Sequence, residues 1–366
     1  MGREDQRRFV LLSIRLRFLR SLHRLDFNGT PFRNATFWKV DTEASNDAEK
    51  LSFSRAYTLA LSPQIIYTRS KLLAQLVSSK VYRQLEFQAV GNWWIYDEAE
   101  TEPLKRLPNG REDIFQDKSI DNKSKRNLMK FLKFVVDYEN HTEVWEPHAD
   151  SSLQEFLSSK FQLSPQLQIV ISALTLSLDA PDRTLVQWAL PRVARHLTSI
   201  GVFGPGFGAV FPKWGGGAEI AQVACRAGAV GGGVYVLGTG VIEPSVTDGT
   251  EAQAEEPKVS LRLSNGETVR TRHRVRPDTQ VSSGSKVVSK IIAVISSSLS
   301  SIFASSIEGS PPAAVSVVVF SPSSFSQGTL SPTSPVYIMV HSSETGECPA
   351  GQCEYLISFR SFLCIT

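Results

Sequence analysis

Residues 201–238 read GVFGPGFGAVFPKWGGGAEIAQVACRAGAVGGGVYVLG and hold 12 of the chain's 24 glycines. Glycine at this density indicates backbone that turns at positive φ or lies close against a partner, so we interpret the stretch as a built site and not as a spacer. Residues 218–229 contain one glycine and are predicted to form a short helix, whereas residues 234–237, VYVL, are strand formers. The predicted order is loop, helix, tight turn and strand.

The run FPKWGGGAEIAQVACRAGAVGGGVYVL within this stretch resembles the signature of the family of Rab GDP dissociation inhibitors and Rab escort proteins. The shared features are an aromatic residue with proline, a glycine-flanked glutamate, and a helix that ends at Gly-Gly-x-Tyr. In that family the segment is part of the platform that binds a GDP-bound Rab GTPase. The resemblance therefore implies a Rab-binding site at Glu219, Arg226, Val234, Tyr235 and Val236, although this chain has one extra residue before Glu219.

The predicted helix places Glu219 near its N-terminus and Arg226 two turns later on nearly the same face. Carboxylate and guanidinium would then present charges of both signs, which suits orienting a partner through charge-assisted hydrogen bonds. The turn at residues 231–233 would bring Tyr235 back beside the helix as an amphipathic contact. The alternative is that Glu219 only caps its own helix and that Arg226 pairs internally.

The composition is that of an ordinary globular protein, with 366 residues, 42% hydrophobic and 20% charged. A chain of this length can bury a core and would divide into about two domains. A net charge of +3 from 39 basic and 36 acidic residues predicts no nucleic-acid partner. Four cysteines do not make a disulfide framework in so long a chain, and reduced thiols of a cytoplasmic protein are expected. No apolar run reaches the roughly 18 residues of a membrane span.

The first 106 residues are expected to hold a basic segment and then part of a sheet domain. Residues 1–30 are a basic amphipathic segment that fits a targeting or membrane-surface helix, an ordinary amphipathic helix, or sequence foreign to the native protein. Residues 31–106 are predicted to contain a helix from about 69 to 79 and strands around 85–90 and 93–96, and we interpret Trp93 and Trp94 as sheet packing.

Residues 107–200 are predicted to form a helical domain inserted between the two β-rich parts. Asp121 can cap a helix, Ser152 with Glu155 forms a capping box, and Ser164 with Pro165 opens a further helix. Leu128, Phe131 and Leu132 recur at helical spacing, and we expect them to be core.

The helical block refines the resemblance, because REDIFQDKSIDNKSKRNLMKFLKFV is similar to the escort-protein version of this domain. The resemblance implies a surface that docks on the Rab geranylgeranyltransferase heterodimer and a pocket for the geranylgeranyl lipid, which we place within residues 121–200. Leu153 and Phe156 are the candidate residues for a protruding anchor on the transferase.

Residues 201–366 are predicted to form the second part of the sheet domain, with the platform. Strands at 259–263 and 267–275 flank Asn265-Gly266, which predicts a hairpin with a type I′ turn. Further strands are expected at 314–320 and 335–342. The run HSSETGECPAGQC resembles the fungal-type escort-protein ending, whereas LISFRSFLCIT does not, so the resemblance covers about residues 31 to 353. It implies that the family's N-terminal βαβ unit is absent.

No motif predicts catalysis, and we expect no catalytic residue, no cofactor and no metal site. The glycine-rich turns contain neither GxxxxGK[ST] nor GxGxxG. None of the six histidines stands at metal-ligand spacing in the sequence, and Cys348 with Cys353 lacks a second pair for zinc. The fold class implied by the resemblance is mixed α/β (α+β), a GDI-like sheet domain related to FAD/NAD(P)-binding folds with an inserted helical domain.

The function implied by the resemblance is that of a Rab escort protein, a non-catalytic accessory that binds GDP-bound Rab, presents it to the transferase and delivers the prenylated Rab to membranes. It would be cytoplasmic with transient membrane contact. Burial of the lipid, at about 0.8 kcal/mol per methylene, would favour such a complex. The alternatives are a Rab GDP dissociation inhibitor that recycles prenylated Rab and, third, a flavin-dependent oxidoreductase of related fold, against which the missing dinucleotide motif argues.

Overall fold

The computed structural model describes residues 52–60, 63–108, 111–246, 259–275, 288–305, 311–325 and 333–360. These residues fall into two compact units, and the division lies inside helix α9 (Gly217–Val230), after Cys225. The second unit contains the described residues of Arg226–Ser285. The basic segment and the absence of an N-terminal βαβ unit, both predicted above, concern positions outside the described ranges. Among the described helices, none has the length and apolar character needed to cross a bilayer.

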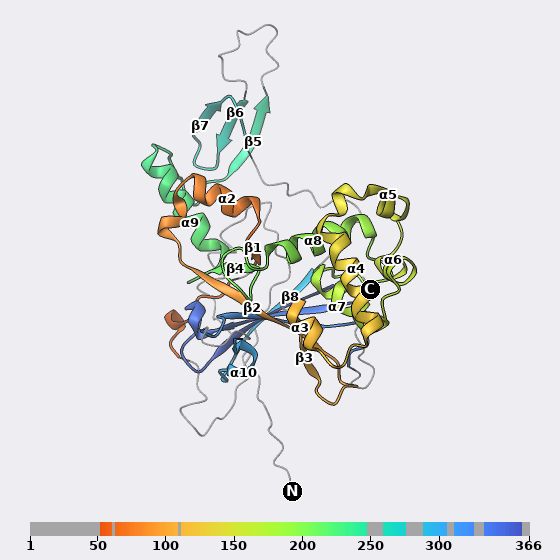
Figure 1. Ribbon diagram of the computed structural model, residues 1–366. Coiled ribbons are helices and arrows are strands. Elements are labelled where there is room, and N and C mark those ends of the chain that lie inside the picture. Colours follow the sequence, from red (N-terminus) through yellow and green to blue (C-terminus); the bar gives the residue numbers. More distant parts are fainter. Residues whose placement is uncertain are drawn as a thin grey trace, which may run out of the picture. The chain divides into compact units, whose positions relative to one another are not determined.

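An eight-stranded sheet organises the first unit (Figure 1). The strands follow the order β1-β4-β2-β9-β10-β11-β8, and β3 pairs with β2. Strands β2 and β9 are parallel, and the other pairs are antiparallel. The strands are β1 (Ile66–Tyr67), β2 (Phe87–Tyr96), β3 (Leu104–Arg106), β4 (Ala209–Pro212), β8 (Val288–Ile295), β9 (Val315–Phe320), β10 (Val336–Ser342) and β11 (Cys353–Arg360).

Strand β9 shows why the sheet has a core on both faces. Its residues Val315, Val317 and Val319 pack into one hydrophobic cluster, while Val318 packs into another on the opposite face. Alternate residues of a strand point to opposite faces, and a strand buried on both therefore reads as a continuous run of β-branched residues. The predicted strands at 314–320 and 335–342 are confirmed as β9 and β10.

Strand β2 joins two segments that the sequence analysis predicted as separate strands. It runs from Phe87 to Tyr96, with a register shift between Val90 and Trp93 on its β9 side. Trp93 is buried in the sheet core, and the indole N–H of Trp94 donates to the carbonyl oxygen of Ile302 at 3.1 Å. The interpretation of both tryptophans as packing residues is confirmed.

Helices fill residues 111–199, as predicted. Asp121 accepts hydrogen bonds from the backbone N–H groups of Lys123 and Ser124, and Ser152 accepts one from Glu155. The helices are α3 (Arg111–Gln116), α4 (Asn122–Val136), α5 (Thr142–Trp145), α6 (Leu153–Phe161), α7 (Pro165–Leu174) and α8 (Val186–Ser199), with 3-10 turns η4 (Tyr138–Asn140) and η5 (Glu146–His148). Whether they form a separate domain stays a prediction.

The helices share one core, which includes Leu128 and Phe131 as expected. Leu153 and Phe156 lie in the same core and are fully buried. The prediction that these two side chains protrude as anchors is therefore wrong, because the capped helix α6 turns its apolar face inward against α4 and α8. The C-terminal end of α7 packs on the sheet through Ala173 and Leu174.

Smaller elements complete the first unit. Helix α2 begins after Ser70, whose side chain accepts a hydrogen bond from the backbone N–H of Leu73. These elements are η2 (Ser54–Ala56), α2 (Lys71–Ser78), η3 (Val81–Gln84), α10 (Ser300–Phe303) and η6 (Ser343–Thr345).

The second unit contains the end of α9 and a three-stranded sheet in the order β5-β6-β7. Its antiparallel strands are β5 (Val241–Val246), β6 (Val259–Leu263) and β7 (Thr268–Thr271). The predicted hairpin is present, but its turn is not type I′. Gly266 alone has positive φ, and its N–H bonds to Leu263, so the loop is a three-residue turn that ends in a left-handed glycine.

Candidate partner-binding surface

The glycine-rich stretch contains the buried strand β4, which is followed by a strained turn at Trp214. This residue has φ 75°, a left-handed conformation that bulky residues rarely adopt. Its N–H donates to the carbonyl oxygen of Thr345 at 2.8 Å, and its ring lies where a Cβ on Gly346 would be only 2.3 Å away. The side chain is still 53% exposed. Strain of this kind concentrates at functional sites, so Trp214 is a candidate contact that the sequence analysis missed.

Charged groups flank Trp214. The ammonium nitrogen of Lys213 lies 4.7 Å from the centre of the indole ring and 3.0 Å from a carboxylate oxygen of Glu86. Glu219 stands in the first turn of α9, as predicted, and accepts a hydrogen bond from the Gln222 side chain at 3.3 Å. The carboxylate of Glu219 is half-buried and keeps a local partner.

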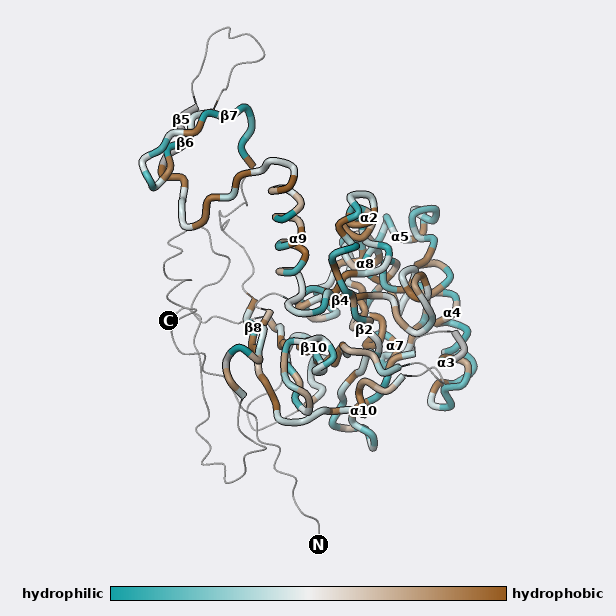
Figure 2. The backbone as a smooth tube through the Cα atoms, turned by 90° about the vertical axis from the view of Figure 1, so that its left-hand side faces the viewer, coloured by the Kyte–Doolittle hydropathy of each residue, from teal (hydrophilic) through white to brown (hydrophobic). Residues whose placement is uncertain are grey.

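Arg226 belongs to the second unit and is exposed. Within the described ranges it forms no ion pair, and the alternative in which Arg226 pairs internally stays untested. Helix α9 alternates hydrophobic and hydrophilic residues along its length (Figure 2) and buries Val223 alone among its side chains. Because Glu219 and Arg226 fall in different units, a single two-signed surface stays a prediction.

The segment after α9 folds back on the helix without forming a strand. The N–H of Gly233 donates to the carbonyl oxygen of Gly228 at 2.8 Å, and the Tyr235 hydroxyl lies where a Cβ on Gly228 would be only 2.2 Å away. The turn thus returns Tyr235 to the helix, as predicted.

The strand predicted at residues 234–237 is wrong. Among the described residues no strand pairs with this segment, and its four side chains are 52% to 93% exposed. A β-branched composition favours a strand only where a neighbouring strand completes the hydrogen bonds. Here Val234, Tyr235 and Val236 form an exposed amphipathic run eight to ten residues after Arg226, in the same unit. We call Arg226, Val234, Tyr235 and Val236 the post-helix patch.

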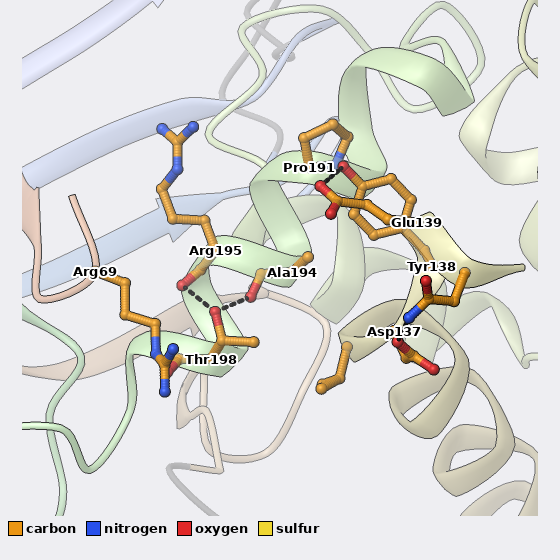
Figure 3. Close-up of a pocket in the computed structure, with 10 residues that line it drawn as sticks. Arg69, Asp137, Tyr138, Glu139, Pro191, Ala194, Arg195 and Thr198 are labelled. Atoms are coloured by element: carbon orange, nitrogen blue, oxygen red, sulfur yellow. Dashed lines mark hydrogen bonds between the residues drawn. The ribbon is translucent and has the colours of Figure 1, made fainter. Parts of the chain in front are cut away.

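The helical block was expected to hold a lipid pocket, and an open cavity of about 330 Å³ lies there (Figure 3). It is polar: Arg69 and Arg195 line one side, and Asp137, Tyr138 and Glu139 line the other. The side chain of Arg69 donates from Nε to the carbonyl oxygen of Thr198 at 2.8 Å. A second cavity, of about 630 Å³, is lined largely by polar residues and prolines. The first cavity lacks the apolar lining that a prenyl chain requires, and the second mixes polar side chains with Ile169, Ala180 and three prolines, so the lipid pocket stays a prediction.

The sequence predicts no metal site, but the structure brings together three side chains with metal-ligating atoms. They are His341, Glu347 and Glu354, all buried in the first unit. Their spacing in the sequence matches no metal motif, and it is the pairing of β10 with β11 that makes His341 and Glu354 neighbours.

The fold is similar to that of a known class of protein. The structure superposes on the crystal structure of a Rab GDI from Plasmodium falciparum with a TM-score of 0.60 and 16% identity, over 97% of this chain and 74% of that one. A sequence model of the GDP dissociation inhibitor family matches residues 23–359. The chain belongs to the GDP dissociation inhibitor family. Strand β11 lies inside the match up to Phe359, so the expectation that the likeness ends at residue 353 is wrong.

Curated relatives show more specific sequence similarities. The chain is 38% identical over 211 residues to the Rab proteins geranylgeranyltransferase component A of Saccharomyces cerevisiae, a match that covers 56% of this chain and 34% of that protein. Against the protein of the same name from Drosophila melanogaster, identity is 31% over 231 residues, covering 58% of this chain and 43% of the relative. The chain thus spans about a third to two fifths of the length of these relatives.

Proposed function

We propose that this chain acts as a Rab escort protein, which binds GDP-bound Rab GTPases and presents them to Rab geranylgeranyltransferase. The family assignment and the names of the relatives, component A of that transferase, support the proposal. They also favour an escort protein over an inhibitor that only recycles prenylated Rab. The role is that of an accessory without its own catalysis, in the cytoplasm and transiently at membranes.

The post-helix patch is the observation that carries the proposal. Arg226 is exposed and unpaired within the described ranges, and Tyr235 of the same unit offers a half-exposed ring and a hydroxyl. Tyrosine and arginine are the residues that most often dominate the energy of a protein interface. Val234 and Val236, which are 85% and 55% exposed, add apolar area. Glu219 is proposed to contribute from the first turn of α9.

The helical block is proposed to dock the transferase and to shield the lipid. Its anchors must be side chains other than Leu153 and Phe156, which are buried. Phe115 and Trp188 are the aromatic residues of this block with exposed rings, and the guanidinium carbon of Arg192 lies 3.5 Å from the centre of the Trp188 ring. These two rings replace the earlier candidates. The core of the helices would have to open to receive a prenyl chain.

The Rab-binding proposal is tested by titrating the chain with a GDP-loaded Rab. We expect Arg226→Ala and Tyr235→Ala each to weaken binding by at least about 1 kcal/mol, a roughly fivefold rise in Kd, with little change in Tm. The matched controls are Arg272→Ala and Tyr82→Ala, which remove an exposed arginine and an exposed tyrosine elsewhere. Unchanged Kd in both patch variants would place the Rab contact elsewhere.

Binding to the transferase separates the escort protein from the recycling inhibitor. The full chain, incubated with a GDP-loaded Rab and the purified transferase heterodimer, is expected to elute with both in size-exclusion chromatography. Replacement of Phe115 by Ser and, separately, of Trp188 by Ser is expected to release the transferase while the Rab stays bound. A complex with Rab that never includes the transferase would support the inhibitor instead.

A further inference from the structure

The hairpin of β10 and β11 buries a cluster of three ionisable side chains, which we call the hairpin cluster: His341, Glu347 and Glu354. All three are completely inaccessible to solvent. Each offers one potential ligand atom, and these atoms lie within 4.8 Å of one another. A tetrahedral ion with bonds near 2 Å holds its ligand atoms about 3.3 Å apart, so the three side chains would draw closer together around it.

The strand register explains why the residues meet. His341 and Glu354 are direct cross-strand partners in the β10–β11 pair. Because side chains alternate along a strand, both lie on the sheet face that also carries Met339 and Leu356. Glu347 comes from the connection after η6, which is held by a hydrogen bond of 2.9 Å from the Thr58 N–H to the Glu347 carbonyl oxygen.

The hairpin cluster places ionisable side chains where the alternation along the strands predicts apolar ones. Tyr337, Met339 and Leu356 are apolar residues of the core on this face, and the same alternation leads to His341 and Glu354 at the next positions. The ring of Phe211 packs against the imidazole with centroids 4.4 Å apart. Ionisable groups at core positions of an otherwise regular sheet indicate a functional or specially stabilised site.

Most polar atoms of the cluster have no partner. His341 Nδ1 forms a hydrogen bond with Glu347 Oε2. Among the described residues, His341 Nε2, Glu347 Oε1 and both carboxylate oxygens of Glu354 are buried with no hydrogen-bond partner. Leaving a buried charged group unpaired costs several kcal/mol, and two adjacent carboxylates also repel each other. A positive charge at the centre of the cluster would remove both costs.

We propose that the hairpin cluster binds a divalent transition-metal cation of the Zn²⁺ type. Two carboxylates and a neutral imidazole around one divalent cation sum to zero charge, which suits a site without solvent contact. Imidazole nitrogen and carboxylate oxygen are both zinc ligands, and a water molecule can complete the fourth position of a tetrahedron. Because the site is closed, the ion is structural and fastens the β10–β11 connection to the face of the sheet.

The competing arrangement needs no metal. A proton on Glu354, with a charged His341 beside an ionised Glu347, is also neutral overall. The two arrangements differ in what they predict for Glu354→Gln, because glutamine copies a protonated glutamate in shape and charge but is a poor metal ligand. The protonated arrangement predicts an equal or higher Tm for this variant and no response to metal.

The test uses the full chain without an affinity tag that binds metal. After dialysis against a chelator and removal of the chelator, Zn²⁺ is titrated by calorimetry, and bound zinc is measured by mass spectrometry. We expect about one equivalent of zinc per chain and a higher Tm in the presence of Zn²⁺. Co²⁺ as a second probe is expected to give visible d–d absorption bands. Glu354→Gln should weaken Zn²⁺ binding at least about tenfold, whereas Glu344→Gln, an exposed glutamate of the same connection, should leave it unchanged.

Zinc content and the response of Tm in the wild-type chain test the proposal even if a variant fails to fold. A wild-type chain that keeps no zinc and whose Tm does not respond to Zn²⁺ or Co²⁺ would overturn the proposal. Zinc binding of equal strength in the wild type and a folded Glu354→Gln variant would overturn it as well, because the ion would then lie elsewhere.

Discussion

The core of the helical block and the post-helix patch use similar residues in opposite ways. Leucine and phenylalanine at helical spacing pack on one another, so Leu153 and Phe156 are at most 1% exposed. Valine and tyrosine after α9 have no periodic partner and remain 52% to 85% exposed in the patch. A periodic apolar residue thus stabilises the fold, whereas an apolar run that follows a helix end and lacks a partner strand is available to another molecule.

The largest expected effect is on the free energy of unfolding, which should fall when a core residue of the helical block is truncated but not when an exposed residue after α9 is. Phe156→Ala removes a ring that is 1% exposed, and we expect it to lower the free energy of unfolding by about 3–5 kcal/mol, from lost burial and the cavity left behind. Urea unfolding followed by circular dichroism measures the change. Leu237→Ala, at a side chain that is 93% exposed, is the control and should change stability by less than about 0.5 kcal/mol. Similar losses of stability in both variants would contradict the contrast between the helical core and the exposed segment after α9.

The second effect is a loss of folding stability in acid. We expect it because His196 of α8 is buried. Burial lowers the pKa of this imidazole to about 4, from 6.5. Its neighbours are the Tyr67 hydroxyl, 3.4 Å from Nδ1, and the edge-packed ring of Trp93. The unfolded chain binds a proton there below pH 6.5 while the folded chain does not, so stability is lost as pH falls from 6.5 towards 4, by about 3 kcal/mol in total.

Urea unfolding at a series of pH values checks this expectation. The wild type should lose more stability over that window than His196→Gln, which carries no titrating group at the site. Parallel pH profiles for the two proteins would show that His196 does not remain neutral in the folded chain. The exposed His273 offers the control, since His273→Gln should leave the profile of the wild type unchanged.

The smallest effect acts on the patch alone. Gly228→Ala introduces a methyl group only 2.2 Å from the Tyr235 hydroxyl, so the ring must move away from α9. We expect GDP-Rab binding to weaken by about 1 kcal/mol, while the greater helix propensity of alanine keeps Tm equal or slightly higher. Ala227→Ser, at the neighbouring exposed position, serves as the control. Unaltered Rab affinity for Gly228→Ala would mean that the placement of Tyr235 does not matter to the partner.

Local signals allowed much of the fold to be predicted. Asp121 and Ser152 mark helix starts because the chemistry of an N-cap is contained within four residues. The Asn265-Gly266 pair located a hairpin but misled about its turn type, since one left-handed glycine satisfies a different loop. The helical period placed Leu153 and Phe156 on a helix but did not reveal that their side chains point into the core.

The missed features depend on contacts between distant segments. Trp214 is strained because it bonds to Thr345 and packs on Gly346, far along the chain. His341 and Glu354 become neighbours only through the strand register. No pattern within a short window contains these relations, although Trp214 stood inside the motif that carried the family resemblance.

The parallel pairing of β2 with β9 has a consequence for how the protein is made. Val90 lies opposite Val315, so the centre of the main sheet cannot close until nearly all of the described chain has left the ribosome. The helices between them form mainly through contacts of short sequence separation and can fold earlier. During synthesis, β2 therefore waits with an open edge beside a finished helical block, and this interval is when the nascent chain most needs a chaperone.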